Sequence, residues 1–113
     1  MNLEKVKKLI NELVSFSVNL KASEINIKLD EIDNYVKIEL TSNVSNLDKS
    51  VIDNLKNKLN TSRMVELEEL YWALLGENSQ SDELFLLGTM IDHCEINYME
   101  NKELKIVLYR FTD

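Results

Sequence analysis

Apolar residues in the first 60 positions change from a helical period to a strand-like period and back. Between residues 3 and 20 they recur every three or four positions, which predicts an amphipathic helix of about 20 residues. Apolar and polar residues then alternate over 25–29 and again over 36–40, with a polar stretch at 30–34 between them. Alternation with a period of two buries one face of a strand, so these segments predict a hairpin with one buried face. The helical period returns in a second predicted helix over 47–60, marked by Val51, Ile52, Leu55 and Leu59.

The second half of the chain predicts two more helices and a second hairpin. Apolar spacing over 62–76 predicts a third helix that ends near Gly76, and Ser81 is placed to cap a fourth. Alternating residues at 96–99 and 104–109 predict two strands that turn at Asn101. The predicted order is α-β-β-α-α-α-β-β. We therefore expect an α+β two-layer sandwich, with about four strands in a mixed sheet and the helices on one face.

The composition is that of one folded domain. Hydrophobic residues make up 44% and charged residues 29% of the 113 positions, so we expect a single domain over residues 1–113. The net charge is −7 and the isoelectric point is near 4.7. Nucleic-acid binders usually carry a basic face, and anionic membranes attract basic segments. We expect neither nucleic acid nor a membrane among the partners.

The sequence also predicts a cytoplasmic location. It contains no apolar run of the roughly 20 residues that a membrane-spanning helix needs, and its N-terminus lacks the apolar block of a signal peptide. Cys94 is the single cysteine, so an internal disulfide is excluded and a reducing compartment is favoured. Abundant Asn, Ile and Lys, whose codons are AT-rich, favour a low-GC bacterial or phage genome.

Residues 81–96 have the frame of a phosphate-binding helix. They read Ser-Asp-Glu-Leu-Phe-Leu-Leu-Gly-Thr-Met-Ile-Asp-His-Cys-Glu-Ile. This resembles the last nucleotide box of the bacterial anti-sigma-factor serine kinases, in the histidine-kinase-like ATPase superfamily, where Gly-Leu-Gly-Leu precedes an apolar helix and an Asp-x-x-Glu step. Ser81 and Glu83 stand at the glycine positions, and the pattern is kept at Leu84, Asp92 and Glu95. The carboxylates of Asp82 and Glu83 at a helix N-terminus repel a triphosphate.

Residues 12–27 resemble the first box of the same superfamily. They begin Glu-Leu-Val-Ser-Phe-Ser-Val-Asn-Leu-Lys-Ala-Ser, similar to Glu-Leu-Val-x-Asn-Ser-Leu-Asp-Ala-Gly-Ala-Thr in mismatch-repair ATPases. The resemblance puts Glu12 at the position of the general base and Phe16 at that of the asparagine that binds Mg²⁺. Magnesium requires oxygen ligands, and a phenyl ring has none. The alternative interpretation of Glu12 is a solvated helix glutamate without a catalytic role.

The second box should follow the second strand as Asp-x-Gly-x-Gly. In the family the aspartate binds the adenine amino group, and the glycines let the backbone approach the base. Here Ser42, Val44 and Asn46 occupy the three positions. A serine hydroxyl lacks the charge-assisted strength of the carboxylate. The alternative is a plain loop in which Asn46 caps the next helix.

His93 and Cys94 are neighbours and suggest metal binding or nucleophilic catalysis. A zinc site needs about four ligands from separate segments, and the chain has one histidine and one cysteine. If a strand begins here, their side chains point to opposite faces and cannot act as a pair. We expect no metal, no cofactor, and a small core residue in Cys94.

Two segments are apolar around the whole helix, at 70–75 and 84–87. A helix on one face of a two-layer domain needs an apolar stripe only about 100° wide. The apolar residues outside such a stripe are buried either in the core or by another chain. Trp and Tyr are enriched at interface hot spots, which favours the second possibility for residues of these types. The candidate partner-binding residues are Tyr71, Trp72, Leu75 and Phe85.

Three functions are compatible with these patterns. The first is a non-catalytic regulatory module on an ATPase scaffold that has lost ATP and Mg²⁺ binding, in bacterial partner-switching signalling. It would bind a protein partner or form a homodimer. The second is a divergent ATP-binding serine kinase or ATPase in which Glu12 is still used, with Ser42 or Asn43 holding the base. The third is a small acidic inhibitor or immunity-type protein, since acidic surfaces steer such proteins onto basic targets.

Overall fold

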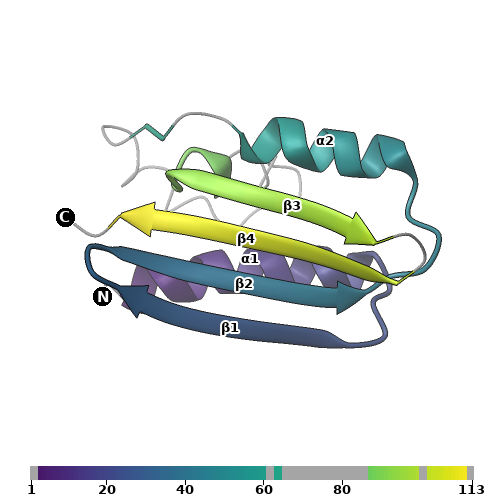
Figure 1. Cartoon of the computed structure of the whole chain (residues 1–113), viewed down its shortest axis with the longest axis horizontal. Helices are drawn as coiled ribbons and strands as arrows, with labels where there is room; N and C mark the ends of the chain where they lie inside the picture. Colours follow the sequence, from purple (N-terminus) through teal and green to yellow (C-terminus); the bar gives the residue numbers. More distant parts are fainter. Residues whose placement is uncertain (1–2, 61–62, 65–86, 100–101, 112–113) are drawn as a thin grey trace.

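The protein is an α+β domain built on a four-stranded sheet (Figure 1). The computed structural model describes residues 3–60, 63–64, 87–99 and 102–111. The elements in chain order are α1 (Leu3–Asn19), β1 (Ile25–Ile32), β2 (Tyr35–Asn43), α2 (Lys49–Leu59), β3 (His93–Met99) and β4 (Glu103–Phe111).

The sheet has the strand order β1-β2-β4-β3, and all three pairings are antiparallel. The prediction of a mixed sheet is therefore wrong. Each hairpin makes its own two strands antiparallel, but the relation between the hairpins is set where β2 meets β4. That pairing runs from Tyr35 opposite Phe111 to Asn43 opposite Glu103, over the full length of both strands.

Two of the four predicted helices are described. α1 and α2 correspond to the predicted first and second helices, at 3–20 and 47–60. The predicted third helix and most of the fourth fall on 65–86, which lie outside the described residues. The described elements follow the order α-β-β-α-β-β, so the predicted order with four helices is not matched.

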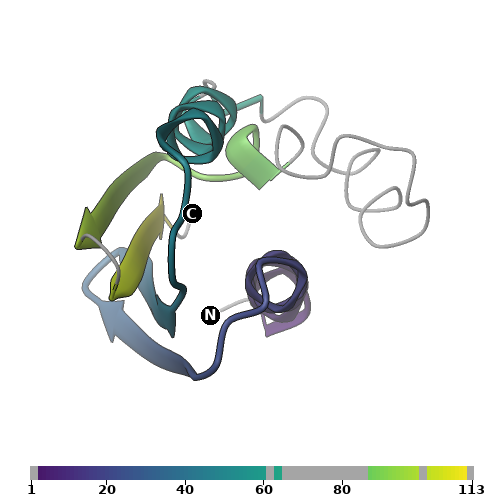
Figure 2. The same ribbon diagram turned by 90° about the vertical axis from the view of Figure 1, so that its right-hand side faces the viewer.

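The molecule has two layers, with α1 and α2 on the same side of the sheet (Figure 2). We call this side the helix face and the opposite side the open face. Even-numbered residues of the central strands β2 and β4 point to the helix face and are buried there, because strand side chains alternate. The core joins them to the inner sides of both helices through Val6, Leu9, Leu13, Leu55 and Leu59.

The first hairpin differs from its prediction at β1. The strand continues to Ile32, and Asp33, with φ of 49°, and Asn34 make the turn. Ile27 and Leu29 point to the helix face, yet they are 40% and 39% exposed. The predicted buried face exists on β2 and is incomplete on β1, because β1 is an edge strand and α1 packs mainly against β2. Within the described part of the chain, no helix is long and apolar enough to cross a membrane.

Candidate functional site

The two residues of the first box lie on α1 and belong to the packed interior. Glu12 is 7% exposed, so its interpretation as a solvated helix glutamate is wrong. Phe16 is partly buried and packs against the core cluster. The position at which the resemblance expects a magnesium ligand therefore holds a ring that packs among apolar side chains.

The second box is also built into the interior. Ser42 is the last buried residue on the helix face of β2, 1% exposed, and its Oγ has no hydrogen-bond partner in the described structure. Val44 is 4% exposed. The hydroxyl of Tyr98 on β3 donates to the carbonyl of Val44 at 2.7 Å and accepts from the backbone N–H of Leu47 at 3.2 Å. Tyr98 thus fastens the loop after β2 to the far edge of the sheet.

Asn46 does not cap α2. It is exposed and has a φ of 56°, a left-handed conformation that asparagine tolerates. The N-cap is Asp48, whose side chain makes no capping hydrogen bond. The predicted cap was displaced because the left-handed turn at Asn46 adds two residues before the helix begins.

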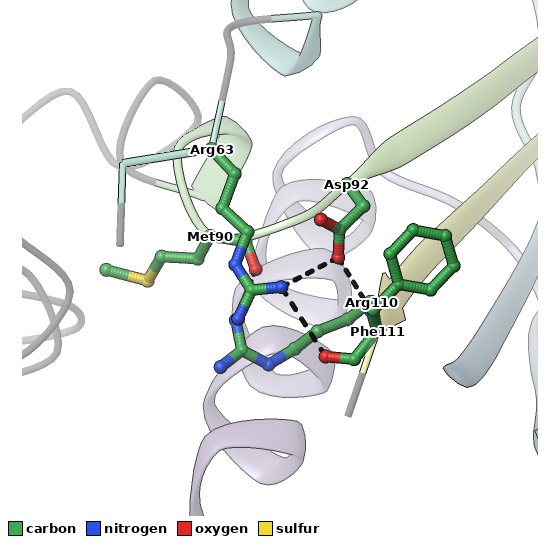
Figure 3. A network of polar contacts seen from close by, with 5 residues as sticks. All are labelled: Arg63, Met90, Asp92, Arg110 and Phe111. Carbon is green, nitrogen blue, oxygen red and sulfur yellow. Dashed lines mark hydrogen bonds and ion pairs between the residues drawn. The ribbon is translucent and has the colours of Figure 1, made fainter. Parts of the chain in front are cut away.

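The third box is described only in part, since Ser81, Glu83 and Leu84 lie outside the described residues. Asp92 holds three segments together (Figure 3). Its Oδ2 accepts from the backbone N–H of Phe111 at 2.6 Å and from Nη1 of Arg63 at 2.9 Å. Its own N–H donates to the carbonyl of Tyr109 at 2.8 Å. Asp92 therefore connects the segment after α2 and the start of β3 to the end of β4.

A second arginine supports the same corner. Arg110 is 9% exposed, and its Nη1 donates to the carbonyl of Met90 at 2.6 Å (Figure 3). A guanidinium suits this place because it offers several N–H donors in a fixed plane. We call Arg63, Met90, Asp92, Arg110 and Phe111, with the hydrogen bonds between them, the latch. Its hydrogen bonds give the carboxylate at position 92 a structural role that needs no nucleotide.

His93 and Cys94 point to opposite faces, as the alternation predicted. His93 is exposed, whereas Cys94 is 7% exposed and its Sγ lies 3.6 Å from the carbonyl of Leu59. Burial, and secondarily the negative charge of Glu95, raises the pKa of the Cys94 thiol. The thiol therefore stays protonated at neutral pH and acts as a core residue. Among the described residues, no group of three or more His, Cys, Asp or Glu could hold a metal ion.

The open face carries a cluster of rings where β2 and β4 meet the start of β3. The ring of Tyr35 lies 5.8 Å from that of Tyr109 and 6.1 Å from that of Phe111. His93 extends the cluster, with its ring 5.5 Å from that of Tyr109. Ile32 pairs with Tyr35 and adds an apolar side chain that is 37% exposed. We call Ile32, Tyr35, His93, Tyr109 and Phe111 the aromatic patch.

Charges of both signs border the aromatic patch. The Tyr109 hydroxyl donates to Glu95 at 3.0 Å, and Nζ of Lys37 lies 6.0 Å from the Tyr109 ring centre. Desolvation, the hydrogen bond to Glu95 and the nearby carboxylate charges raise the pKa of Tyr109, which keeps the hydroxyl neutral. Further along the face, Lys105 pairs with Glu39 at 3.7 Å. The result is a surface of rings with a polar rim.

The aromatic patch was not among the predicted sites. The signal was available, because Tyr35, Tyr109 and Phe111 occupy the odd positions of strands whose even positions are apolar. Rings at positions expected to be polar mark an apolar surface outside the core. The residues predicted to bind a partner, Tyr71, Trp72, Leu75 and Phe85, lie outside the described residues.

Comparison of the chain with protein-family models, curated proteins and solved structures finds no match in any of the three. Its function is therefore inferred from its own residues.

Proposed function

We propose that this protein is a non-catalytic regulatory module that binds a protein partner, on a scaffold related to the histidine-kinase-like ATPases. The observation that carries the proposal is the aromatic patch on the open face. Phe111 is 48% exposed there, beside two tyrosines and a histidine, and α1 and α2 cover the other side of the sheet. Exposed apolar surface with a polar rim is typical of interaction sites.

The chemistry of the patch suits a protein surface. Aromatic rings provide a large contact area at a low cost in side-chain entropy, and they are enriched at interface hot spots. Lys37 and Glu95 at the rim can pair with polar groups of the partner. The chain's net charge of −7 favours a partner with a basic or neutral contact surface over nucleic acid.

Packing at the first two boxes supports a loss of nucleotide binding. Phe16 contacts the core, and Val44 is buried in the loop after β2, where its carbonyl accepts a hydrogen bond from Tyr98. A nucleotide at these positions would have to displace side chains that hold the two layers together. The three box segments keep the apolar framework of the anti-sigma-factor kinases but not their nucleotide-binding residues. This resemblance suggests descent from such kinases and a role in cytoplasmic partner switching. A second surface around Trp72 and Phe85, which binds a protein partner or a second copy of the chain, is part of the same proposal.

Phe111→Ser is expected to weaken partner binding by about thirtyfold, the effect of losing one interface hot spot of about 2 kcal/mol. Affinity capture from an extract of the source cells, followed by titration of the captured partner, measures the effect. Asn97→Ser is the matched control, because it changes an exposed residue of the open face at β3, away from the rings. Equal affinity of the wild type and Phe111→Ser for every captured protein would contradict the proposed role of the patch.

Millimolar Mg²⁺-ATP or Mg²⁺-ADP is expected to leave the thermal unfolding midpoint unchanged. A ligand present at about 100 times its dissociation constant adds about 2.7 kcal/mol of stability. In a domain of this size that would raise the midpoint on the order of 10 °C. A clear rise would contradict the loss of nucleotide binding.

One observation favours a second candidate, a divergent ATPase or serine kinase. The buried Oγ of Ser42 has no hydrogen-bond partner in the described structure, and it stands where the family's aspartate holds adenine. If nucleotide raises the unfolding midpoint, Ser42→Ala should reduce the rise. Glu12→Ala should then remove turnover and leave nucleotide binding intact.

A further inference from the structure

β1 forms one edge of the sheet. β1 is the first strand of the sheet order, and within the described residues no strand lies beyond it. Two even-numbered residues fix which backbone groups face β2. Ile32 pairs with Tyr35 across the two-residue turn, and the carbonyl of Glu24 accepts from the N–H of Asn43. Because antiparallel ladders alternate, even-numbered residues of β1 bond to β2. The odd-numbered residues turn their N–H and C=O groups outward, at Ile25, Ile27, Leu29 and Glu31.

β1 lacks three of the features that usually protect an edge strand. Natural edges are often short, contain proline or carry a bulge, and they also use charged side chains, which β1 has at Lys28, Asp30 and Glu31. β1 has eight residues without proline and pairs with β2 residue by residue, with no bulge from Ile25 to Ile32. On its helix face, Ile27 and Leu29 are 40% and 39% exposed. A regular, half-exposed apolar edge is suited to the addition of another strand.

The charges of β1 are complementary to those of a second copy of β1 in one register. Two identical antiparallel strands meet about a two-fold axis, and opposite residues share a face of the sheet. An axis at Leu29 places Leu29 opposite Leu29 of the partner subunit. Lys28 then faces Asp30 of the partner subunit, and by symmetry Asp30 faces Lys28 of the partner subunit. The pairing thus gives two contacts of opposite charge on the open face.

Neighbouring registers place like charges opposite each other. An axis at Lys28 pairs the two lysines, and an axis at Asp30 pairs the two aspartates. An axis at Ile27 sets Asp30 opposite Glu24 of the partner subunit, twice. Like charges directly opposite each other destabilise a strand pair, so among these registers only the one centred on Leu29 is favoured by its charges.

We propose that the partner at this edge is a second copy of the chain, paired antiparallel through β1 with Leu29 at the two-fold axis. The pairing joins two four-stranded sheets into one continuous sheet. On the helix face it places Leu29 opposite Leu29 of the partner subunit and Ile27 opposite Glu31 of the partner subunit, and it leaves the rings of the aromatic patch on the open face uncovered. The dimer therefore does not depend on the partner binding proposed above.

Charge exchange on β1 tests the register directly. Lys28→Glu gives a strand with acidic residues at 28 and 30, and Asp30→Lys gives one with basic residues at both. Each single variant should be monomeric, with self-association at least about tenfold weaker than in the wild type. An equimolar mixture of the two variants should form a heterodimer, because every facing pair is then of opposite charge. The double variant Lys28→Glu with Asp30→Lys should dimerise like the wild type.

Sedimentation equilibrium of the full chain measures these states, with 13.2 kDa for the monomer and twice that mass for the dimer. Salt near 0.15 M shortens the screening length to about 8 Å, which weakens the long-range repulsion between copies of charge −7 more than that between adjacent pairs. Lys102→Glu is the matched control, since it makes the same charge change at an exposed turn residue and should dimerise normally. Lys28 and Asp30 also face Glu39 and Lys37 on β2, so thermal unfolding must confirm that each variant is folded.

Each result decides the proposal. A wild-type dimer, monomeric single variants and a heterodimer in their mixture support it, and misfolding cannot explain the recovery in the mixture. A wild-type monomer up to millimolar concentration would overturn the proposal. Single variants that dimerise as well as the wild type would overturn the register and place the interface elsewhere.

Discussion

Gly88→Ala is expected to lower the free energy of unfolding by about 3 kcal/mol, the upper part of the range for overpacked sites. Gly88 lies against the last turn of α2, and a Cβ there would overlap the carbonyl oxygen of Lys58. The same Cβ would lie 3.2 Å from Cα of Leu59 and 3.3 Å from the carbonyl carbon of Lys58. These are backbone atoms of a packed helix, so the contact is relieved only if the two segments move apart.

Urea unfolding of Gly88→Ala and the wild type measures this difference. Helix propensity alone predicts the opposite sign, because alanine is favoured over glycine by about 1 kcal/mol in a helix. Ser50→Ala on the exposed side of α2 is the control, and its stability should stay within about 0.5 kcal/mol of the wild type. A Gly88→Ala variant as stable as the wild type would show that α2 and residue 88 are not in close contact.

Asp92→Ala should also lower the free energy of unfolding by about 3 kcal/mol, because hydrogen bonds to a charged group contribute roughly 1.5–3 kcal/mol each. The carboxylate accepts from the N–H of Phe111 and from Arg63, and the side chains of Asp92 and Arg63 are only 19% and 11% exposed. Removing the carboxylate takes one negative charge away from a largely buried guanidinium. Arg63 keeps a longer contact, 3.4 Å, with the carbonyl of Phe111.

The matched variant Asp92→Asn separates shape from charge. Its amide oxygen can still accept from Phe111, so it should lose about half as much stability as Asp92→Ala. A double-mutant cycle of Asp92→Ala with Arg63→Met, measured by urea unfolding, isolates the coupling between the two side chains. If Asp92→Ala unfolds within about 0.5 kcal/mol of the wild type, the latch of Figure 3 does not stabilise the fold.

The candidate site was predictable only where local alternation decides the geometry. His93 and Cys94 had to point apart on a strand, and Cys94 is indeed buried while His93 is exposed. The latch at Asp92 was not predictable, because its partners Phe111 and Arg63 are 19 and 29 residues away in sequence. Glu12 was misassigned for a related reason. The helical period shows which side of α1 is apolar, but not how far neighbouring segments cover its flank.

The sequence by itself determined the local elements of this protein. Residue periodicity placed α1, α2 and the two hairpins, because the period of apolar residues follows from the geometry of one helix or one strand. Only the tertiary structure decided how the hairpins meet. The pairing of β2 with β4 made the sheet antiparallel, left the apolar residues of β1 half exposed at an edge, and brought Tyr35 beside Tyr109 and Phe111. Paired residues of β2 and β4 are 60 to 76 positions apart in the sequence, and no local pattern records such a distance.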